Sequence, residues 1–312
     1  MPATIIDGKK IAKTFKETAS KLILMLREDG LKPCLSVILV GDDAASKIYV
    51  RQKEKACKEV GLVSRIICLA DTCTQTQLEQ VVKDQVKDSE VVGVLVQMPL
   101  PEHLNAKMAL RHIPPHKDVD GFGYANVGKL WNGEFAHNIA CTPRGIIHAF
   151  DAMSIDLCGK HVVIVGRSNT VGKPLAALCL DRHATVSVCH SKTPDLASMT
   201  KQADILICAV GKAKLITADM VKPGAVVIDV GINRVDEKLC GDVDFDSVKE
   251  IASYITPVPG GVGPLTVGQL MLNAAESAWH QRNIMRLDKT KKENKAWVES
   301  LSQETNTETM SN

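Results

Sequence analysis

The sequence predicts an α/β protein with an N-terminal α/β domain and a Rossmann-like domain built on a doubly wound parallel sheet. Three observations support this class: β-branched apolar runs alternate with helical patterns, one strand–helix–strand unit has the size of a βαβ crossover, and 312 residues suffice for two cores. We expect the first domain over residues 1–145, completed by a C-terminal helix over 266–285, and the second over 146–265. Residues 286–312 lose the apolar periodicity and are predicted to form a disordered tail.

The N-terminal domain is predicted from regular alternation of helical and extended patterns. A helical pattern over residues 5–30 ends at Gly30, and the chain then gives apolar runs that are too short for helices. The expected strands are 35–40, 63–69 and 91–96, and the expected helices are 46–61, 74–87 and 105–112. Strands that alternate with helices in this way predict a largely parallel sheet.

Two polar positions in this domain are candidates for chemistry. Tyr49 and Lys53 are four residues apart and therefore share one helix face, where a lysine among other charges is either a solvated surface residue or a catalytic group. Gln97 ends a strand at the edge where open α/β sheets place ligands, and Met98 and Pro99 follow it. A glutamine at a strand end is more often a capping or turn residue than a catalytic one.

A pair of carboxylates follows. Asp118 and Asp120 stand beside Gly121, and this arrangement suits either half of a metal site or a tight turn. The ten cysteines form no C-x-x-C pair and lie mostly in apolar runs, as expected for free thiols of a reducing compartment. We therefore expect no metal.

The second domain contains the βαβ unit around which the chain is organised. After a helix over 145–153, the expected order is strand 161–165, helix 174–180 and strand 184–189. The loop from Gly166 to Gly172 reads G-x-x-x-x-x-G, which departs from the dinucleotide fingerprint G-x-G-x-x-G. It is either a phosphate loop at a helix N-terminus or an ordinary strand-to-helix turn.

The end of the second strand bears on the cofactor. An NAD site places an acidic residue there for the ribose hydroxyl, whereas this chain has His190, Ser191, Lys192 and Thr193. Hydroxyls and cations, together with Arg167 in the loop, suit a 2′-phosphate and therefore NADP rather than NAD. A polar turn without a ligand explains the same residues.

The last third continues the alternation. Strands are expected over 205–209 and 225–230, and they end near Gly211 and Gly231 at the side where a cofactor crevice would lie. The loop from Pro257 to Pro264 is rich in glycine and proline, and it leads into a helix over 266–282. Its glycines allow close approach to a ligand, and its prolines hold its shape.

Composition limits the classes of partner. The formal net charge of +2 indicates no general attraction to nucleic acid or to an anionic membrane. No apolar run approaches the length of a membrane span, and the first twenty residues lack an apolar signal core and contain no arginine. We therefore expect a cytoplasmic protein rather than a mitochondrial one.

Five stretches taken together resemble one known family. In order they are YVRQKEKACKEVG, VLVQMPLPEHLN, PPHKDVDGFGYANVGKL, VVIVGRSNTVGKPLA and ITPVPGGVGPLTVGQLM. They are similar to the methylenetetrahydrofolate dehydrogenase/methenyltetrahydrofolate cyclohydrolase family over about Ile5 to Ala278. The resemblance implies a bifunctional enzyme, without the formyltetrahydrofolate synthetase domain of the trifunctional members, that acts on tetrahydrofolate derivatives as a homodimer.

The resemblance also implies the site residues. The catalytic set is Lys53 with Tyr49, Gln97 and Asp120. The positions implied to bind the folate are Tyr49, Lys53, Gln97, Met98, Pro99, Asp120, Pro259, Gly260, Gly261, Val262 and Gly263. The positions implied to bind the cofactor are Thr142, Gly166, Arg167, Ser168, Gly172, Ser191 and Ile232.

Each implied role fits the chemistry of its residue type. Lys53 would serve as base and then acid in the hydrolase step, Gln97 would orient it, and Tyr49 would pack against the folate ring. Asp120 would accept hydrogen bonds from the pterin. NAD-preferring members carry an insertion and H-R-Y-T where this chain reads C-H-S-K-T without an insertion, which favours NADP. A monofunctional NAD-dependent dehydrogenase and a non-catalytic folate-binding protein are the alternatives.

Overall fold

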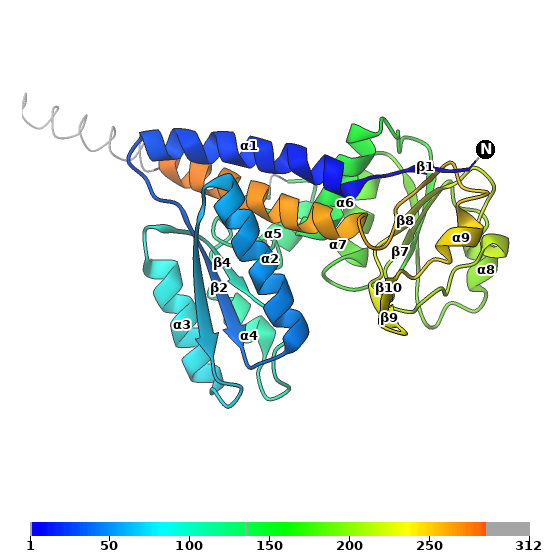
Figure 1. Ribbon diagram of the computed structural model, residues 1–312. Coiled ribbons are helices and arrows are strands. Elements are labelled where there is room, and N and C mark those ends of the chain that lie inside the picture. Colours follow the sequence, from blue (N-terminus) through cyan, green and yellow to red (C-terminus); the bar gives the residue numbers. More distant parts are fainter. Residues whose placement is uncertain (1, 135, 285–312) are drawn as a thin grey trace, which may run out of the picture.

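The computed structural model describes residues 2–134 and 136–284, and it contains a small and a large parallel sheet with helices packed on them (Figure 1). The small sheet has the order β3-β2-β4, with β2 at Cys34–Val40, β3 at Val63–Leu69 and β4 at Val91–Val96. Its helices are α2 (Ala44–Val60), α3 (Gln75–Lys87) and α4 (Ala106–Leu110), and the chain then forms α5 (Tyr124–Trp131) before it reaches the large sheet. The strands expected at 63–69 and 91–96 are confirmed to the residue. Strand β2, expected over 35–40, begins one residue earlier, at Cys34.

The large sheet has six strands in the order β1-β11-β8-β7-β5-β6, and every neighbouring pair is parallel. The strands are β1 (Thr4–Ile5), β5 (His161–Val165), β6 (Thr185–Cys189), β7 (Ile205–Cys208), β8 (Val226–Asp229) and β11 (Tyr254–Ile255). From β5 the chain first adds β6 on one side and then β7 and β8 on the other. The order therefore reverses between β5 and β7, as in a doubly wound sheet, and the predicted fold class is confirmed.

The remaining elements surround this sheet. Its helices and one 3₁₀ turn are α6 (Cys141–Ala152), α7 (Gly172–Asp181), α8 (Leu196–Thr200), η1 (Ala218–Met220) and α9 (Phe245–Val248). A two-stranded antiparallel ribbon is formed by β9 (Asn233–Val235) and β10 (Lys238–Cys240).

Several predicted helix starts differ from the structure, and local sequence explains two of the larger differences. The pattern from residue 5 is a helix only from Gly8, because Asp7 caps α1 (Gly8–Glu28) by accepting hydrogen bonds from the backbone N–H groups of Lys9 and Lys10. The residues before it form β1, which pairs with β11. Helix α6 begins at Cys141 rather than at residue 145, since Pro143 stands in its first turn, where no N–H is needed.

Each sheet has apolar side chains on both faces. In β5, Val162 and Ile164 belong to one buried cluster, and Val163 and Val165 belong to the cluster on the opposite face. The strands of the small sheet divide in the same way between two further clusters. Strands buried on both faces explain why their sequences read as continuous apolar runs.

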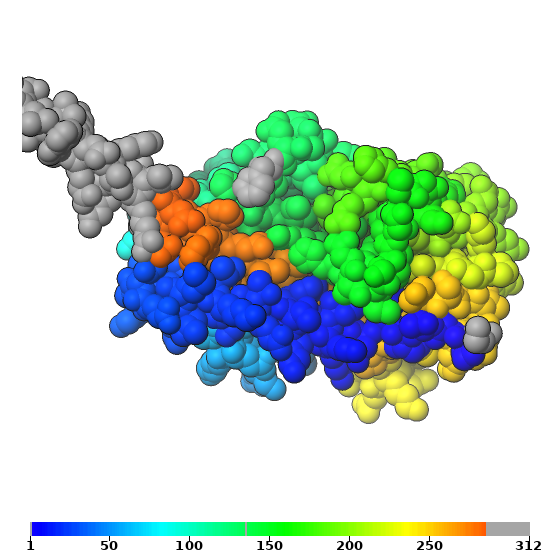
Figure 2. Space-filling view, turned by 90° about the horizontal axis from the view of Figure 1, so that it is seen from above, coloured from blue at the N-terminus to red at the C-terminus, as the bar shows by residue number. Residues whose placement is uncertain are grey.

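Two long helices join the two sheets. Helix α1 contributes Phe15 to the core of the large sheet and Ile23 to the core of the small one. The C-terminal helix, described over residues 262–284, does the same with Leu265 and Met271. Both helices run from one sheet to the other in Figure 1, and Figure 2 shows α1, in blue, along the surface of both halves.

The C-terminal helix begins four residues before its expected start at 266. Residue 285 and the predicted disordered tail, 286–312, lie outside the described residues. The division into domains at residue 145 stays a prediction. Over residues 2–134 and 136–284, no helix is both long and apolar enough to span a membrane.

Candidate active site

Lys53 and Gln97 meet at the carboxyl end of the small sheet. Lys53 lies half-buried on α2, and its Nζ donates a hydrogen bond of 2.9 Å to Oε1 of Gln97, which directly follows β4. The Gln97 backbone N–H donates to the carbonyl of Ile38, and its side-chain Nε2 donates to the carbonyl of Met98 at 2.7 Å. Because Nε2 has a carbonyl partner, Oε1 is the atom that faces the lysine. The hydrogen bond expected between these two side chains is therefore present.

The neighbours of this pair are more open. Tyr49, one helical turn before Lys53, is 38% exposed. Met98 is half-buried and Pro99 is exposed, and the peptide bond between them is cis. Gln97 itself is 8% exposed, so Lys53 is the more open member of the pair.

The two carboxylates of the D-V-D-G segment have different surroundings. Asp118 is 2% exposed and accepts hydrogen bonds from the backbone N–H groups of Phe122 and Gly123 and from Nδ2 of Asn126. It organises the turn before α5, so the turn interpretation fits this residue. Within the described residues, no group of three or more His, Cys, Asp or Glu side chains is arranged to hold a metal ion.

Asp120 has no such set of backbone donors. Burial raises the pKa of its carboxyl to about 6, against the opposing effect of the nearby positive charge of Lys53, while Asp118 adds to the rise. The Sγ atom of Cys141 lies 3.9 Å from Asp120 Oδ1. The effect of Lys53 on this pKa places the Asp120 carboxyl near the Lys53–Gln97 pair.

Thr142 connects this group to the C-terminal helix. Its hydroxyl lies 2.8 Å from the hydroxyl of Thr266, in the first turns of that helix. The helix begins within the P-G-G-V-G segment, at Val262, and the Val258–Pro259 peptide bond that enters this segment is cis. Thr142 is thus adjacent in sequence to Cys141 and in contact with the helix that the loop begins.

The residues of the P-G-G-V-G loop differ in exposure. Pro259 and Gly263 are exposed, and Gly260 is half-buried. Gly261 is buried, and a Cβ atom added there would lie 2.6 Å from the carbonyl oxygen of Pro257. Val262 is 4% exposed and packs into the core of the large sheet. The exposed positions can meet a ligand, whereas Val262 anchors the loop.

The glycine loop lies at the point where the strand order of the large sheet reverses. Gly166 follows β5 with a φ of +128°, and a Cβ atom there would lie 2.3 Å from the carbonyl oxygen of Ala209, which follows β7. A Cβ atom at Gly172 would lie 2.0 Å from the carbonyl oxygen of Gly166. Since no side chain fits at either position, the loop folds tightly despite its imperfect fingerprint.

The candidate cofactor-binding residues around these strand ends are mostly exposed. Register pairs Val165 with Cys189, so Arg167 and Ser191, each two residues further on, follow neighbouring strand ends, and both are exposed. Ser168 Oγ accepts hydrogen bonds from the N–H groups of Val171 and Gly172 and so caps the start of α7. Ile232, after β8, is 49% exposed.

Sequence reasoning missed two buried carboxylates beside this crevice. Asp242 is fully buried and accepts hydrogen bonds from the consecutive N–H groups of residues 210–212. Asp229, at 3% exposure, accepts from the N–H groups of Gly231, Asp242 and Val243, and burial raises its pKa to about 6. Together they fix the loops after β7 and β8. An aspartate at the end of the apolar run of β8 was the available signal.

Two family models match the chain. The model described as "Tetrahydrofolate dehydrogenase/cyclohydrolase, catalytic domain" matches residues 6–120, and the one described as "Tetrahydrofolate dehydrogenase/cyclohydrolase, NAD(P)-binding domain" matches residues 140–282. A relative named "Bifunctional protein FolD" from Geobacillus thermodenitrificans is 53% identical over 279 residues, which cover 89% of this chain and 98% of the relative.

Solved structures with the same arrangement are similar over nearly as much of the chain. The bifunctional FolD enzyme of Campylobacter jejuni has a TM-score of 0.88 at 46% identity, covering 89% of this chain and 99% of that one. The methylenetetrahydrofolate dehydrogenase-cyclohydrolase of Trypanosoma brucei, solved with NADP and an inhibitor, has a TM-score of 0.86 at 36% identity, covering 90% and 98%.

Proposed function

The chain belongs to the tetrahydrofolate dehydrogenase/cyclohydrolase family, and we propose that it catalyses two consecutive steps of folate one-carbon chemistry. The first is the NADP-dependent oxidation of 5,10-methylenetetrahydrofolate to 5,10-methenyltetrahydrofolate. The second is hydrolysis of that product to 10-formyltetrahydrofolate. The observation that carries the proposal is the Lys53–Gln97 hydrogen bond with the carboxyl of Asp120 near the lysine, all three within the region that matches the catalytic-domain model.

The hydrolase step requires a group that moves protons. Water adds to the cationic methenyl carbon and loses a proton, and the bond from that carbon to one ring nitrogen breaks to leave a formyl group. Lys53 is the group proposed to accept the proton and then return one to the leaving nitrogen. Gln97 holds Lys53 Nζ at a fixed position, because its own amide is held by the Met98 carbonyl.

The dehydrogenase step depends mainly on positioning. When bound, NADP accepts a hydride at C4 of its nicotinamide. Asp120 is proposed to accept hydrogen bonds from the pterin amine and amide, and Tyr49 to cover the folate ring. Thr142, in contact with Thr266, is proposed to lie near the nicotinamide. These residues would hold the methylene bridge between the hydrolytic group and the cofactor.

The residues around the glycine loop fit NADP. Gly166 and Gly172 leave both ends of the loop without side chains, and helix α7 begins at Gly172. Backbone N–H groups at such a helix start suit the binding of a pyrophosphate. Arg167 and Ser191 at adjacent strand ends offer a cation and a hydroxyl for a 2′-phosphate. These contacts support NADP over NAD, and the solved relative with NADP shares the fold.

We further propose a homodimer in the cytoplasm. The homodimer follows from the family resemblance, and all ten cysteines are free thiols, as a reducing compartment would keep them. Sedimentation equilibrium of the purified full chain checks the dimer, since a mass of one chain at all concentrations would contradict it.

One experiment tests the proposed reactions together. Purified protein is mixed with methylenetetrahydrofolate and either NADP or NAD, and in a third sample with methenyltetrahydrofolate alone. We expect rapid reduction of NADP, slow reduction of NAD, and hydrolysis in the third sample. Preferred reduction of NAD without hydrolysis would instead indicate the monofunctional dehydrogenase. Binding of folate without either reaction would indicate a non-catalytic protein.

A further inference from the structure

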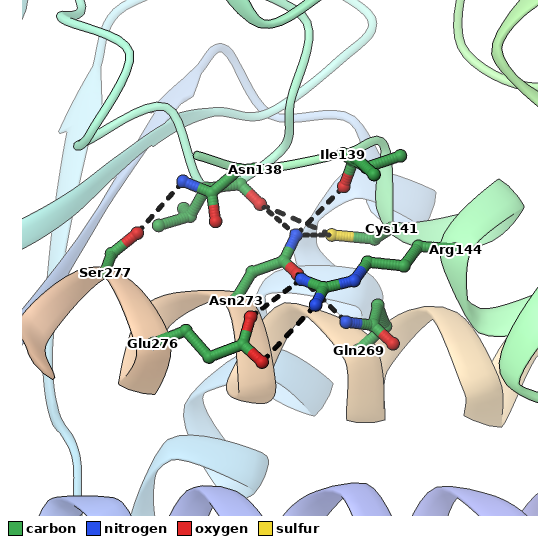
Figure 3. A network of polar contacts seen from close by, with 9 residues as sticks. Asn138, Ile139, Cys141, Arg144, Gln269, Asn273, Glu276 and Ser277 are labelled. Carbon is green, nitrogen blue, oxygen red and sulfur yellow. Dashed lines mark hydrogen bonds and ion pairs between the residues drawn. The ribbon is translucent and has the colours of Figure 1, made fainter. Parts of the chain in front are cut away.

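A buried amide on the C-terminal helix connects the segments that carry the proposed site residues (Figure 3). Asn273 is fully buried, and its Nδ2 donates hydrogen bonds to the carbonyl oxygens of Val119 at 2.9 Å and Ile139 at 3.0 Å. The same atom lies 3.5 Å from Sγ of Cys141. These partners are far from Asn273 in sequence and come from two different segments.

The orientation of this amide is fixed by its other side. Asn273 Oδ1 accepts hydrogen bonds from Nη1 of Arg144 at 2.7 Å and from Nε2 of Gln269 at 2.9 Å. Arg144 in turn forms an ion pair with Glu276, one turn along the helix from Asn273. A reversed amide would place donors against donors and an oxygen against two carbonyls. The position therefore requires a side chain with both a carbonyl acceptor and an NH₂ group. Aspartate lacks the NH₂ group, and leucine lacks both.

Both carbonyl partners adjoin residues of the proposed site. Val119 directly precedes Asp120, and Ile139 precedes Ala140, the residue before the first turn of α6 with Cys141 and Thr142. The two segments are in close contact, since a Cβ atom at Gly121 would lie 2.5 Å from the backbone N of Ala140. Cys141 Sγ lies 3.5 Å from the Val119 carbonyl and 3.9 Å from Asp120 Oδ1. Asn273 thus stands directly behind Asp120 and Thr142.

We propose that Asn273 is a positioning residue that sets the distance between the folate-gripping Asp120 and the nicotinamide-side Thr142. The inference rests on the proposed function, because it takes the roles of these two residues from it. Asn273 touches neither substrate nor cofactor; it acts through the Val119 and Ile139 carbonyls. The same bound folate undergoes both steps. Loss of the Asn273 hydrogen bonds should therefore misalign its one-carbon bridge both with the nicotinamide and with the attacking water.

The test is Asn273→Asp, which keeps the shape and the acceptor but puts an oxygen against two carbonyls. We expect kcat/KM for methylenetetrahydrofolate and for methenyltetrahydrofolate to fall in parallel by about tenfold, with kcat lowered in both. The Kd for NADP, measured by titration without folate, should stay within about twofold, because the glycine loop and Arg167 are not touched. A parallel loss in both steps with unchanged cofactor binding is the signature of positioning.

The matched control is Ser277→Ala, on the same helix and one turn further. It removes the partner of Asn138 Nδ2, a buried contact between the C-terminal helix and the segment that contains Ile139, but it leaves both hydrogen bonds to the Val119 and Ile139 carbonyls in place. We expect a lower melting temperature and unchanged kinetics. If Asn273→Asp also lowers only the melting temperature, Asn273 is merely structural and the inference is wrong. If Asn273→Asp does not fold, Asn273→Ala, which adds no buried charge, is held to the same criterion.

The activity of the wild-type protein distinguishes a failure of the proposed function from a failure of the Asn273 inference alone. If it carries out neither step, the proposed function fails and the inference with it. If it carries out both and the Asn273 variants match Ser277→Ala, only the inference fails.

Discussion

In the half of the site that faces the small sheet, functional side chains hold one another, whereas at the large sheet the backbone forms the crevice and polar side chains stay exposed. Lys53 is fixed by Gln97, and the half-buried Asp120 lies near Lys53. Arg167 and Ser191, by contrast, extend from strand ends shaped by Gly166 and Gly172. A side-chain change should therefore remove chemistry in the first half and adjust ligand choice in the second.

The largest effect is expected from Lys53→Met. Loss of the proton-transfer group should reduce hydrolysis of methenyltetrahydrofolate by about 10³-fold, while dehydrogenation continues, because hydride transfer needs no proton acceptor. Steady-state rates with each folate measure both. Lys55→Met is the control, since Lys55 is exposed on the same helix and should change neither rate. Normal hydrolysis by Lys53→Met would mean that another group is the base.

The next effect is expected from Gly172→Ala. The added Cβ would lie 2.0 Å from the Gly166 carbonyl oxygen, so the loop must open, and the KM for NADP should rise by about 100-fold. Hydrolysis of methenyltetrahydrofolate needs no cofactor and reports that the variant is folded. Gly128→Ala is the control, because a Cβ atom there meets nothing within 4 Å. An unchanged KM in Gly172→Ala would show that the loop does not shape the cofactor site.

Removing the positive charge of Arg167 in the glycine loop should change the preference for NADP over NAD rather than the activity itself. Arg167→Ala is expected to raise the KM for NADP by about 10- to 100-fold and to leave the KM for NAD unchanged, since only NADP carries the 2′-phosphate. Rates with each cofactor over a range of concentrations give the ratio. Lys160→Ala is the matched control, because it also removes one positive charge, but just before β5, at the opposite end of that strand from Arg167. Equal losses with NADP and NAD would contradict a 2′-phosphate contact.

The smallest effect is one of stability and pH. The pKa of Asp120 is about 6 in the folded protein, against about 4 for an unfolded chain, so between these values the folded state binds more protons. Stability contributed by this group is therefore lost as pH rises from about 4 to 6. Asp120→Asn has no such loss and should raise the melting temperature by about 2–4 °C near pH 8 but not near pH 4.

Asp229 provides the contrast in the other half. Its pKa is also raised to about 6, but its carboxylate accepts hydrogen bonds from three backbone N–H groups. An amide at this position would turn an N–H₂ group toward one of these donors, so Asp229→Asn should lower the melting temperature at both pH values. Thermal unfolding of both variants at two pH values checks the pair. A stabilised Asp229→Asn would show that the two carboxylates are equivalent.

Elements of both halves differ in how far the sequence predicts them. Strands such as β3, β4 and β5 are predictable to the residue, because each is a short apolar run bounded by turns. Strands β1 and β11 are not, since each has two residues and they pair across most of the chain. Helix α5 contains Gly128 and follows Gly123, so its local pattern resembles a loop.

The same limit applies to the site. Helical spacing predicts that Tyr49 and Lys53 share a face, but their role comes from the family resemblance and not from the spacing. The partnership of Gln97 with Lys53 was expected from that resemblance and is present. Cys141 and Asn273 give no signal, because a single polar residue in an apolar helix pattern reveals neither its burial nor its partners. Such contacts exist only once the segments have packed together.

The measurement that tests the two-step proposal most directly is the product formed per NADP reduced, followed in time for wild-type protein and Lys53→Met. We predict that wild type releases 10-formyltetrahydrofolate with little free methenyltetrahydrofolate. Lys53→Met should reduce NADP but accumulate methenyltetrahydrofolate, which then disappears no faster than it hydrolyses without enzyme. If both proteins give the same product ratio, Lys53 does not carry the second step as proposed.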